Sequence, residues 1–221
     1  MLQATLFGSL PFHLGDLVTT VQRTQLDDDC WVDHAPGWIR GADDLYAAFR
    51  DSLAWRSHRR WIVDHEVVEP RLSTNIAEPS VALREIGHCL TDYYGVGLVA
   101  SWANLYRDGR DSVAWHGDRF RPGALHETVA LASFGGPRTL RIRPRDGGRS
   151  QPWNLASGDL LVMGGPTQHR FEHCIPKAAG AGGRVSVAYR CPRGREFDPA
   201  IVRHHGRNHL QIGRASCRER V

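Results

Sequence analysis

The chain contains 221 residues, of which 41% are hydrophobic and 24% are charged, close to the composition of an average globular domain. This length can form one large β-rich domain with a buried core, so the composition excludes a disordered tail, a collagen and a small disulfide-stapled secreted scaffold. Lysine and arginine exceed aspartate and glutamate by only 28 − 24 = 4, which is too small an excess to identify a nucleic-acid partner.

The N-terminal sequence and the cysteines indicate a cytoplasmic protein. Residues 1–7 contain neither a basic region nor a long apolar region, so they do not form a signal peptide. No stretch approaches the ~18 apolar residues of a membrane helix. The five cysteines are far apart and form no CxxC pair, which is typical of reduced thiols. We therefore expect a cytoplasmic protein without a membrane partner.

Two amphipathic helices are predicted in the first half of the chain. Leu45, Phe49 and Leu53 recur at four-residue spacing behind acidic residues, which predicts a helix over 43–53. A stripe of apolar residues over 79–94, followed directly by a glycine, predicts the second helix.

Short strands account for most of the other predicted elements. Apolar runs at 61–63 and 67–68 predict one or two short strands, ended by Pro70. Beyond the second helix, strand-like runs alternate with glycine, proline and arginine. They lie at 98–106, 128–134, 139–142, 160–163, 171–175 and 185–189. This pattern favours a β-sandwich or barrel of the jelly-roll type.

We expect a mainly β (α+β) fold in which the N-terminal helices pack against a jelly-roll core. No linker or internal repeat divides the chain, so residues 1–210 are predicted to form a single domain. Its N-terminal region covers about 1–97 and its core about 98–195. Residues 211–221 show no periodicity and look like a translated sequencing adapter, so we expect them to be a non-native tail.

A His-x-Asp motif, His116 and Asp118, is the first candidate for a metal site. Because side chains alternate along a strand, both would point to one face and could hold one ion. His173, which follows a buried-looking strand, is the candidate third ligand. Two histidines and a carboxylate form the facial triad of non-haem Fe(II) oxygenases. The alternative is chance, since His-x-Asp is a short motif in a chain with 12 histidines.

Two arginines on the last predicted strand, Arg184 and Arg190, indicate an anionic ligand. They are separated by an even number of positions and therefore share one face of the strand. An arginine inside a jelly roll is costly unless it is paired, and its fork-shaped guanidinium fits a carboxylate. The alternative is a pair of surface arginines flanking the strand.

These residues belong to a longer series of motifs in a fixed order. The series comprises Asn104–Gly109, Asp111–Asp118, Ser133–Gly135, Arg138–Arg141, Gly158–Thr167, His173 and Arg184–Arg190. With this series the sequence resembles the AlkB family of Fe(II)/2-oxoglutarate-dependent dioxygenases over about residues 65–192. The joint occurrence of the motifs is specific, whereas each motif alone is not.

The resemblance implies a double-stranded β-helix core and a role for each matching residue. The implied catalytic Fe(II) ligands are His116, Asp118 and His173. The implied 2-oxoglutarate contacts are Asn104, Tyr106, Arg184 and Arg190. Arg184 would bind the distal carboxylate, whereas Arg190 would lie near the other end of the co-substrate and near Asp118.

The resemblance also implies oxidative dealkylation of damaged bases in DNA, with RNA left open, releasing succinate, CO2 and an aldehyde. Such an enzyme must use single strands or flip the base out of a duplex. Arginines gathered around the motifs favour a nucleic-acid partner, although a solvated arginine-rich face is the alternative: Arg107, Arg110, Arg119, Arg121, Arg138, Arg141, Arg143, Arg145 and Arg149. We expect Trp115, Arg119 and Arg138 to contact the substrate.

Two departures from the family pattern bear on the substrate. Many members carry an acidic residue two positions after the iron aspartate, where this chain has Phe120. That difference disfavours 1-methyladenine and 3-methylcytosine and favours neutral etheno adducts. Members often carry an aromatic residue after a Pro-Arg segment, but residues 73–76 contain none. Trp102, Trp115 or Phe120 could stack on the base instead, although a tryptophan is more often a core residue.

Three functional hypotheses follow. The first is a monomeric repair dioxygenase that acts on alkylated nucleic acid. The second is a 2-oxoglutarate oxygenase with the same core that hydroxylates or demethylates a protein side chain or a small molecule. The third is a non-catalytic nucleic-acid-binding jelly roll, which the complete ligand set disfavours because a binding module needs no metal triad.

Overall fold

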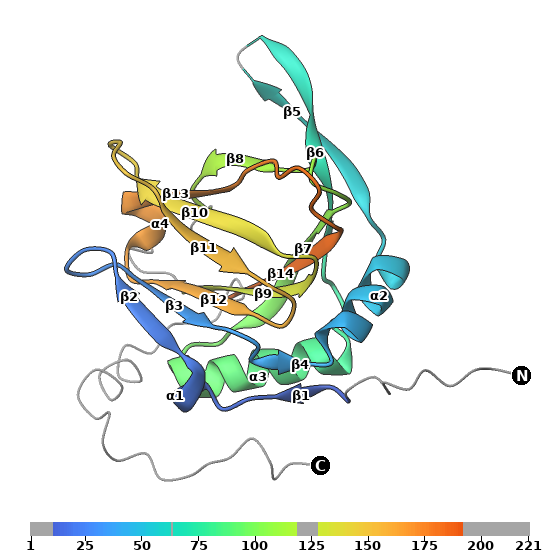
Figure 1. Cartoon of the computed structure of the whole chain (residues 1–221), viewed down its shortest axis with the longest axis vertical. Helices are drawn as coiled ribbons and strands as arrows, with labels where there is room; N and C mark the ends of the chain where they lie inside the picture. Colours follow the sequence, from blue (N-terminus) through green and yellow to red (C-terminus); the bar gives the residue numbers. More distant parts are fainter. Residues whose placement is uncertain (1–10, 63, 119–127, 192–221) are drawn as a thin grey trace, which may run out of the picture.

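The computed structural model describes residues 11–62, 64–118 and 128–191 (Figure 1). The first half of the described chain contains both helices and strands, and the second half consists mainly of strands. In chain order they are β1 (His13–Leu14), α1 (Leu17–Thr20), β2 (Gln22–Gln25), β3 (Trp31–Ala35), β4 (Ile39–Arg40), α2 (Ala42–Ser52), β5 (Arg56–Ile62), β6 (His65–Asn75), α3 (Val81–Tyr94), β7 (Val99–Tyr106), β8 (Val113–His116), β9 (Val129–Gly135), β10 (Arg138–Pro144), β11 (Gln151–Leu155), β12 (Leu160–Gly164), α4 (Thr167–Arg170), β13 (Phe171–Ile175) and β14 (Arg184–Arg190).

Two antiparallel sheets form the body of the protein. The larger sheet has the strand order β2-β3-β12-β9-β14-β7-β6-β5, and the smaller has the order β11-β10-β13-β8. From β7 to β14 the strands alternate between the two sheets, as in a jelly roll, except that β10 and β11 pair with each other in the smaller sheet. The β5–β6 hairpin projects from the body (Figure 1). The predicted mainly β fold with a double-stranded β-helix core is confirmed.

Helices α2 and α3 cover the outer face of the larger sheet. Their buried side chains, such as Phe49 and Ile86, join one hydrophobic cluster with Ala103 and Val187 of the sheet. The α3 helix begins where the Ser80 hydroxyl accepts a hydrogen bond from a backbone N–H in the first turn, and it ends at a left-handed glycine. Both helices therefore form within one or two residues of their predicted bounds.

A second hydrophobic cluster fills the space between the two sheets. It contains Leu140 and Ile142 from β10, Leu161 and Met163 from β12, and Phe171 from β13. Because side chains alternate along each strand, residues an even number of positions away on the same strand also point into the space between the sheets. This alternation directs the functional side chains of β7, β8, β13 and β14 into the space between the sheets.

The structure differs from the predicted strands at several places, because β1, β2, β3, β4 and β11 were not predicted and β6 is longer than predicted. Strand β6 does not end at Pro70 but runs on to Asn75. The proline is tolerated because the β5–β6 pairing is irregular around it, between the partners of Ser57 and Arg59. Strand β11 was not predicted, because Pro152 interrupts a short edge strand, and the pairing of β2 with β3 was not predicted either.

Several predictions concern residues outside the described ranges. Among them are Arg119, Phe120, Arg121 and the proposed tail over 211–221. The division into one domain stays a prediction. Within the described residues, no helix has the length and apolar character needed to cross a membrane. The four cysteines in this part of the chain form no disulfide with one another.

Candidate metal centre

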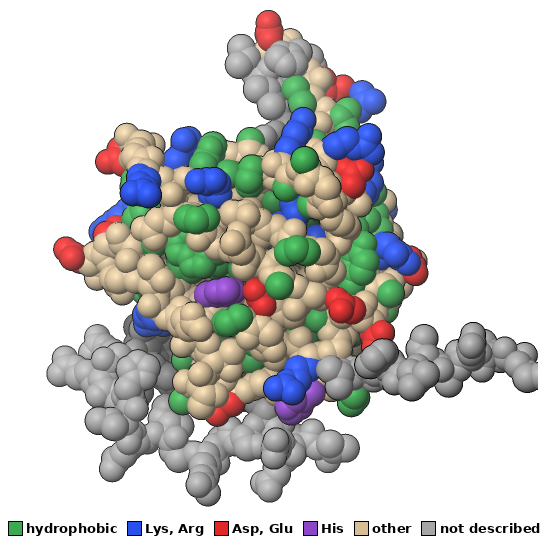
Figure 2. Space-filling model, viewed as in Figure 1, with side chains coloured by type: hydrophobic (Ala, Val, Ile, Leu, Met, Phe, Trp, Pro, Cys, Tyr) green, Lys and Arg blue, Asp and Glu red, His purple; other side chains and the backbone are tan. Residues whose placement is uncertain are grey.

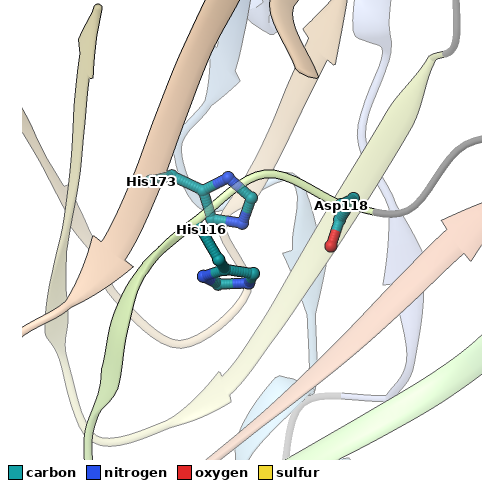
Figure 3. Close-up of side chains that lie close together, drawn as sticks. All are labelled: His116, Asp118 and His173. Carbon is teal, nitrogen blue, oxygen red and sulfur yellow. The ribbon is translucent and has the colours of Figure 1, made fainter. Parts of the chain in front are cut away.

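Two histidines and one aspartate meet between the sheets. His116 is the last residue of β8, and it pairs in register with His173 in the middle of β13. Asp118 follows two residues after the strand. The ligand atoms of the three side chains all lie within 4.8 Å of one another, and the two imidazole centroids are 4.3 Å apart (Figure 3). The three residues that the sequence predicted as metal ligands are therefore brought together.

Both histidines can offer a ring nitrogen to a metal. The Nδ1 atom of His116 lies 2.9 Å from the carbonyl oxygen of Ala114, which can only accept, so Nδ1 carries the proton and Nε2 is left to bind a metal. His173 is almost fully buried, and this burial lowers its pKa to about 4. The ring is therefore uncharged at neutral pH, the form that coordinates a metal.

Asp118 carries the negative charge of the site. Burial opposes its ionisation, but His173, Arg190 and His116 together keep the pKa of this carboxyl below its usual value. Arg190 Nη2 lies 2.7 Å from Asp118 Oδ1. Two imidazoles and one carboxylate fit Fe(II), because this donor set leaves coordination positions open.

Arg184 is a buried cation that lacks a full set of partners. Its side chain is 1% exposed, and its Nη2 donates to the Ser133 hydroxyl at 2.9 Å. Within the described residues, Nε and Nη1 have no hydrogen-bond partner. Burial lowers the pKa of Arg184 to about 10, so the guanidinium is still charged at neutral pH. An unpaired buried cation is costly, and a carboxylate ligand would satisfy these atoms.

Strand β7 places two further predicted residues on the same inner face. The ring of Tyr106 lies between Arg138 and Arg184, whose guanidinium carbons are 5.1 Å and 5.5 Å from its centroid. Asn104 accepts a hydrogen bond from Arg71 Nε at 3.0 Å through its Oδ1, which leaves its NH2 group as a donor. Both side chains therefore offer polar groups beside Arg184.

Two of the three predicted substrate contacts, Trp115 and Arg138, lie within the described residues, and their environments differ. Trp115 points to the outer face of the smaller sheet, opposite to His116, and Arg143 lies 4.1 Å over its ring. Arg138 is buried, and its guanidinium donates to the backbone carbonyls of Asp108, Asp111 and Pro176. Arg119 lies outside the described residues.

Many of the clustered arginines are already paired with acids or other groups. Arg107 binds Asp111, Arg110 binds Asp108 and Arg143 binds Glu172. Figure 2 shows Lys and Arg side chains intermixed with Asp and Glu side chains on the side of the molecule in view. The count of arginines in the sequence therefore overestimates the positive charge available to a nucleic acid.

Three residues at the site were not assigned a role from the sequence. Ser133 and Gln168 are buried polar residues that contact Arg184 and Asp118 respectively, and Arg71 contacts Asn104. One signal was present: the polar residues at 167–170 separate the apolar run at 160–163 from the strand of His173.

Comparison with known proteins places this site in a class. Residues 49–193 match the family model described as the 2OG-Fe(II) oxygenase superfamily, and the chain belongs to that superfamily. Its fold is similar to that of a prolyl-4-hydroxylase from Pseudomonas putida, with a TM-score of 0.53, 16% identity and coverage of 74% of this chain and 93% of that chain. At this identity the likeness concerns the fold alone.

Within the superfamily the sequence is AlkB-like. It is 34% identical over 109 residues to the alpha-ketoglutarate-dependent dioxygenase alkB homolog 3 of Rattus norvegicus, covering 43% of this chain and 37% of the relative. It is 32% identical over 96 residues to the DNA oxidative demethylase ALKBH2 of Bos taurus, covering 39% and 34%. An uncharacterised protein of Acanthamoeba polyphaga mimivirus, R406, is 30% identical over 103 residues, covering 46% and 53%.

These alignments span about a third to a half of each curated relative. The superfamily uses Fe(II), 2-oxoglutarate and dioxygen, and His116, Asp118 and His173 are the residues of this chain that fit the Fe(II) ligand set. The predicted family and cofactors are confirmed.

Proposed function

We propose that this dioxygenase removes alkyl groups from damaged bases in nucleic acid, with DNA as the first substrate class. The observation that carries the proposal is the inward-facing set of His116, Asp118, His173 and Arg184 in a chain similar to a DNA oxidative demethylase. The relatives' names supply the substrate class, whereas the site supplies the chemistry.

The iron ligands in this proposal are His116, Asp118 and His173. When Fe(II) is bound, it supplies with 2-oxoglutarate and dioxygen the oxidising power that converts a C–H group into C–OH, yielding succinate and CO2. The Ala114 carbonyl fixes the His116 tautomer, and Arg190 keeps the Asp118 carboxylate charged and oriented. A carbon attached to a base nitrogen, once hydroxylated, leaves as an aldehyde and restores the base.

The co-substrate pocket in this proposal is formed by β7 and β14. Arg184 binds the distal carboxylate with the Nε and Nη1 groups that lack partners. The Asn104 amide and the Tyr106 side chain approach the same co-substrate from β7, and Arg190 lies near its other end. Because Arg184 is desolvated before the ligand arrives, the charge-assisted hydrogen bonds are strong.

The substrate side of this proposal rests on β7 and the projecting hairpin. Trp102 lies two residues before Asn104 in unbroken register with β14, so its indole shares the inner face. It is half-buried, and the imidazole of His58 from β5 lies 5.7 Å from its centroid. An indole at this position is suited to stack on an unpaired base. The β5–β6 hairpin projects beside β7 (Figure 1) and carries the exposed Arg56 and Arg59, of which Arg59 pairs with Glu66.

One observation favours a second candidate, a 2-oxoglutarate oxygenase that acts on a protein side chain or a small molecule. The arginines near the site that pair with acids do not offer free charge to a phosphate backbone. The two candidates share the iron and co-substrate residues and differ only in the substrate.

Turnover measured with defined oligonucleotides tests the proposal. The protein is incubated with Fe(II), ascorbate and 2-oxoglutarate, and succinate is measured with unmodified, methylated and etheno-modified oligonucleotides. We expect succinate formation that depends on the lesion and is accompanied by restored bases. Turnover that none of the lesions stimulates would contradict base repair and leave the second candidate.

A further inference from the structure

The aspartate of the metal centre lies beyond the end of its strand. Strand β8 ends at His116, so no sheet hydrogen bonds position Asp118. Gln168 holds this backbone instead, because its Oε1 accepts a hydrogen bond from the Asp118 backbone N–H at 3.0 Å. Gln168 belongs to α4, the short helix that leads directly into β13 and His173.

Gln168 is itself fixed in place. Its side chain is buried, and its Nε2 lies 3.4 Å from the sulfur of Met163 in the core between the sheets. Its backbone carbonyl accepts a hydrogen bond from Arg145 Nη2 at 3.1 Å. The side-chain amide therefore has little rotational freedom, and it links the segment of Asp118 to the rigid core.

Gly117, which lies between the ligands His116 and Asp118, is enclosed by Arg145 and Gln168. A Cβ atom on Gly117 would collide with the guanidinium of Arg145 and would lie 2.7 Å from the Gln168 carbonyl oxygen. The arginine could move aside, but the carbonyl belongs to the backbone. Only glycine therefore allows residues 116–118 to pass this close to α4.

We propose that Gln168 is a positioning residue for metal binding, which sets the place of the Asp118 carboxylate through the Asp118 backbone N–H. A group that orients a ligand raises metal affinity without touching the metal. This inference rests on the proposed iron ligands but not on the proposed nucleic-acid substrate.

Three variants test this role. Gln168→Met keeps a similar volume but removes the acceptor, whereas Gln168→Glu keeps an oxygen at the same reach. Thr167→Val is the matched control, because this neighbouring buried residue donates to Gly164 within its own turn. Each full-length protein is titrated with Co(II) and followed by visible absorption, which reports the coordination geometry. The melting temperature of each metal-free protein is measured in parallel.

We expect Gln168→Met to weaken Co(II) binding by about 10- to 100-fold and to change the Co(II) spectrum. Gln168→Glu should retain most of the affinity, and Thr167→Val should bind like the native protein. If Gln168→Met does not fold, Gly117→Ala takes its place, because the added methyl group displaces the same segment and should also weaken binding.

Native Co(II) affinity and spectrum in Gln168→Met would overturn the inference. Equal losses in the Met and Glu variants would also overturn it, because the effect would then come from packing and not from the acceptor. Absence of Co(II) binding by the native protein would overturn the proposed ligand set as well. The substrate proposal is tested separately, by lesion-dependent turnover.

Discussion

Replacing Arg184 should affect 2-oxoglutarate binding and the stability of the ligand-free protein in different ways. Among the residues that the structure describes, two of its buried donor groups have no hydrogen-bond partner, and each such group costs about 1–3 kcal/mol. Binding of a carboxylate would add two charge-assisted hydrogen bonds worth about 1.5–3 kcal/mol each, or about 3–6 kcal/mol together. Since 1.4 kcal/mol is a factor of ten, Arg184→Met should weaken 2-oxoglutarate binding by about 10²- to 10⁴-fold.

The same substitution should leave the free energy of unfolding of the ligand-free protein unchanged or higher. Replacing a buried charge with an apolar side chain of similar size is often neutral or stabilising, by up to about 4 kcal/mol. Arg138→Met is the matched control, because Arg138 is equally buried beside Tyr106 but donates to three backbone carbonyls. Leaving three carbonyls without their donor should cost about 3 kcal/mol or more.

Two measurements test the expected effects of Arg184→Met and Arg138→Met. Urea denaturation of both ligand-free variants gives the free energy of unfolding, and the increase in native melting temperature with 2-oxoglutarate gives the affinity. The account predicts that Arg184→Met loses the 2-oxoglutarate effect and keeps its stability, while Arg138→Met loses stability. Native affinity in Arg184→Met, or a loss of stability equal to that of Arg138→Met, would refute the reasoning.

Three further predictions concern the metal, the substrate and pH. His116→Ala and Asp118→Ala should each abolish succinate formation because a ligand is lost, and undiminished turnover in either would mean that the iron lies elsewhere. Trp102→Ala should raise KM for a modified oligonucleotide by about 5- to 150-fold, because about 1–3 kcal/mol of stacking is lost. The 2-oxoglutarate affinity should not change. An unchanged KM would argue against stacking of the base on Trp102. Asp159 accepts hydrogen bonds from two backbone N–H groups and pairs with His34, which together keep its pKa low despite its burial. The free energy that the Asp159 carboxylate contributes to stability should be fully present above the unfolded pKa of 3.8 and should be lost as the pH falls below that value. Acid denaturation of Asp159→Asn should therefore be less steep than that of the native protein.

Local patterns predicted the elements that carry the site. The even spacing of Arg184 and Arg190 placed both on one face, and because β14 pairs with β9 without a register shift from Arg184 to Tyr189, the structure keeps them there. One arginine contacts Ser133 and the other contacts Asp118. The two helices were also predictable, because their apolar stripes and terminal signals lie within the helices themselves.

Contacts between distant segments could not be predicted in this way. Gln168 and Asp118 are 50 positions apart, and only the folded sheets bring them together. Trp115 and Trp102 have the same residue type, but the direction of each indole follows from strand register, which a single sequence does not fix. The arginine pairs Arg107–Asp111 and Arg110–Asp108, in contrast, are local and were visible in the sequence as neighbouring charges.

The most direct test of the central claim is the stoichiometry of the reaction on a modified oligonucleotide. Restored base, aldehyde and succinate are quantified together by mass spectrometry after incubation with Fe(II), 2-oxoglutarate and dioxygen. The account predicts that the three products rise in equal amounts and that none forms without 2-oxoglutarate. Succinate formed without restored base or aldehyde would contradict dealkylation of nucleic acid by this protein.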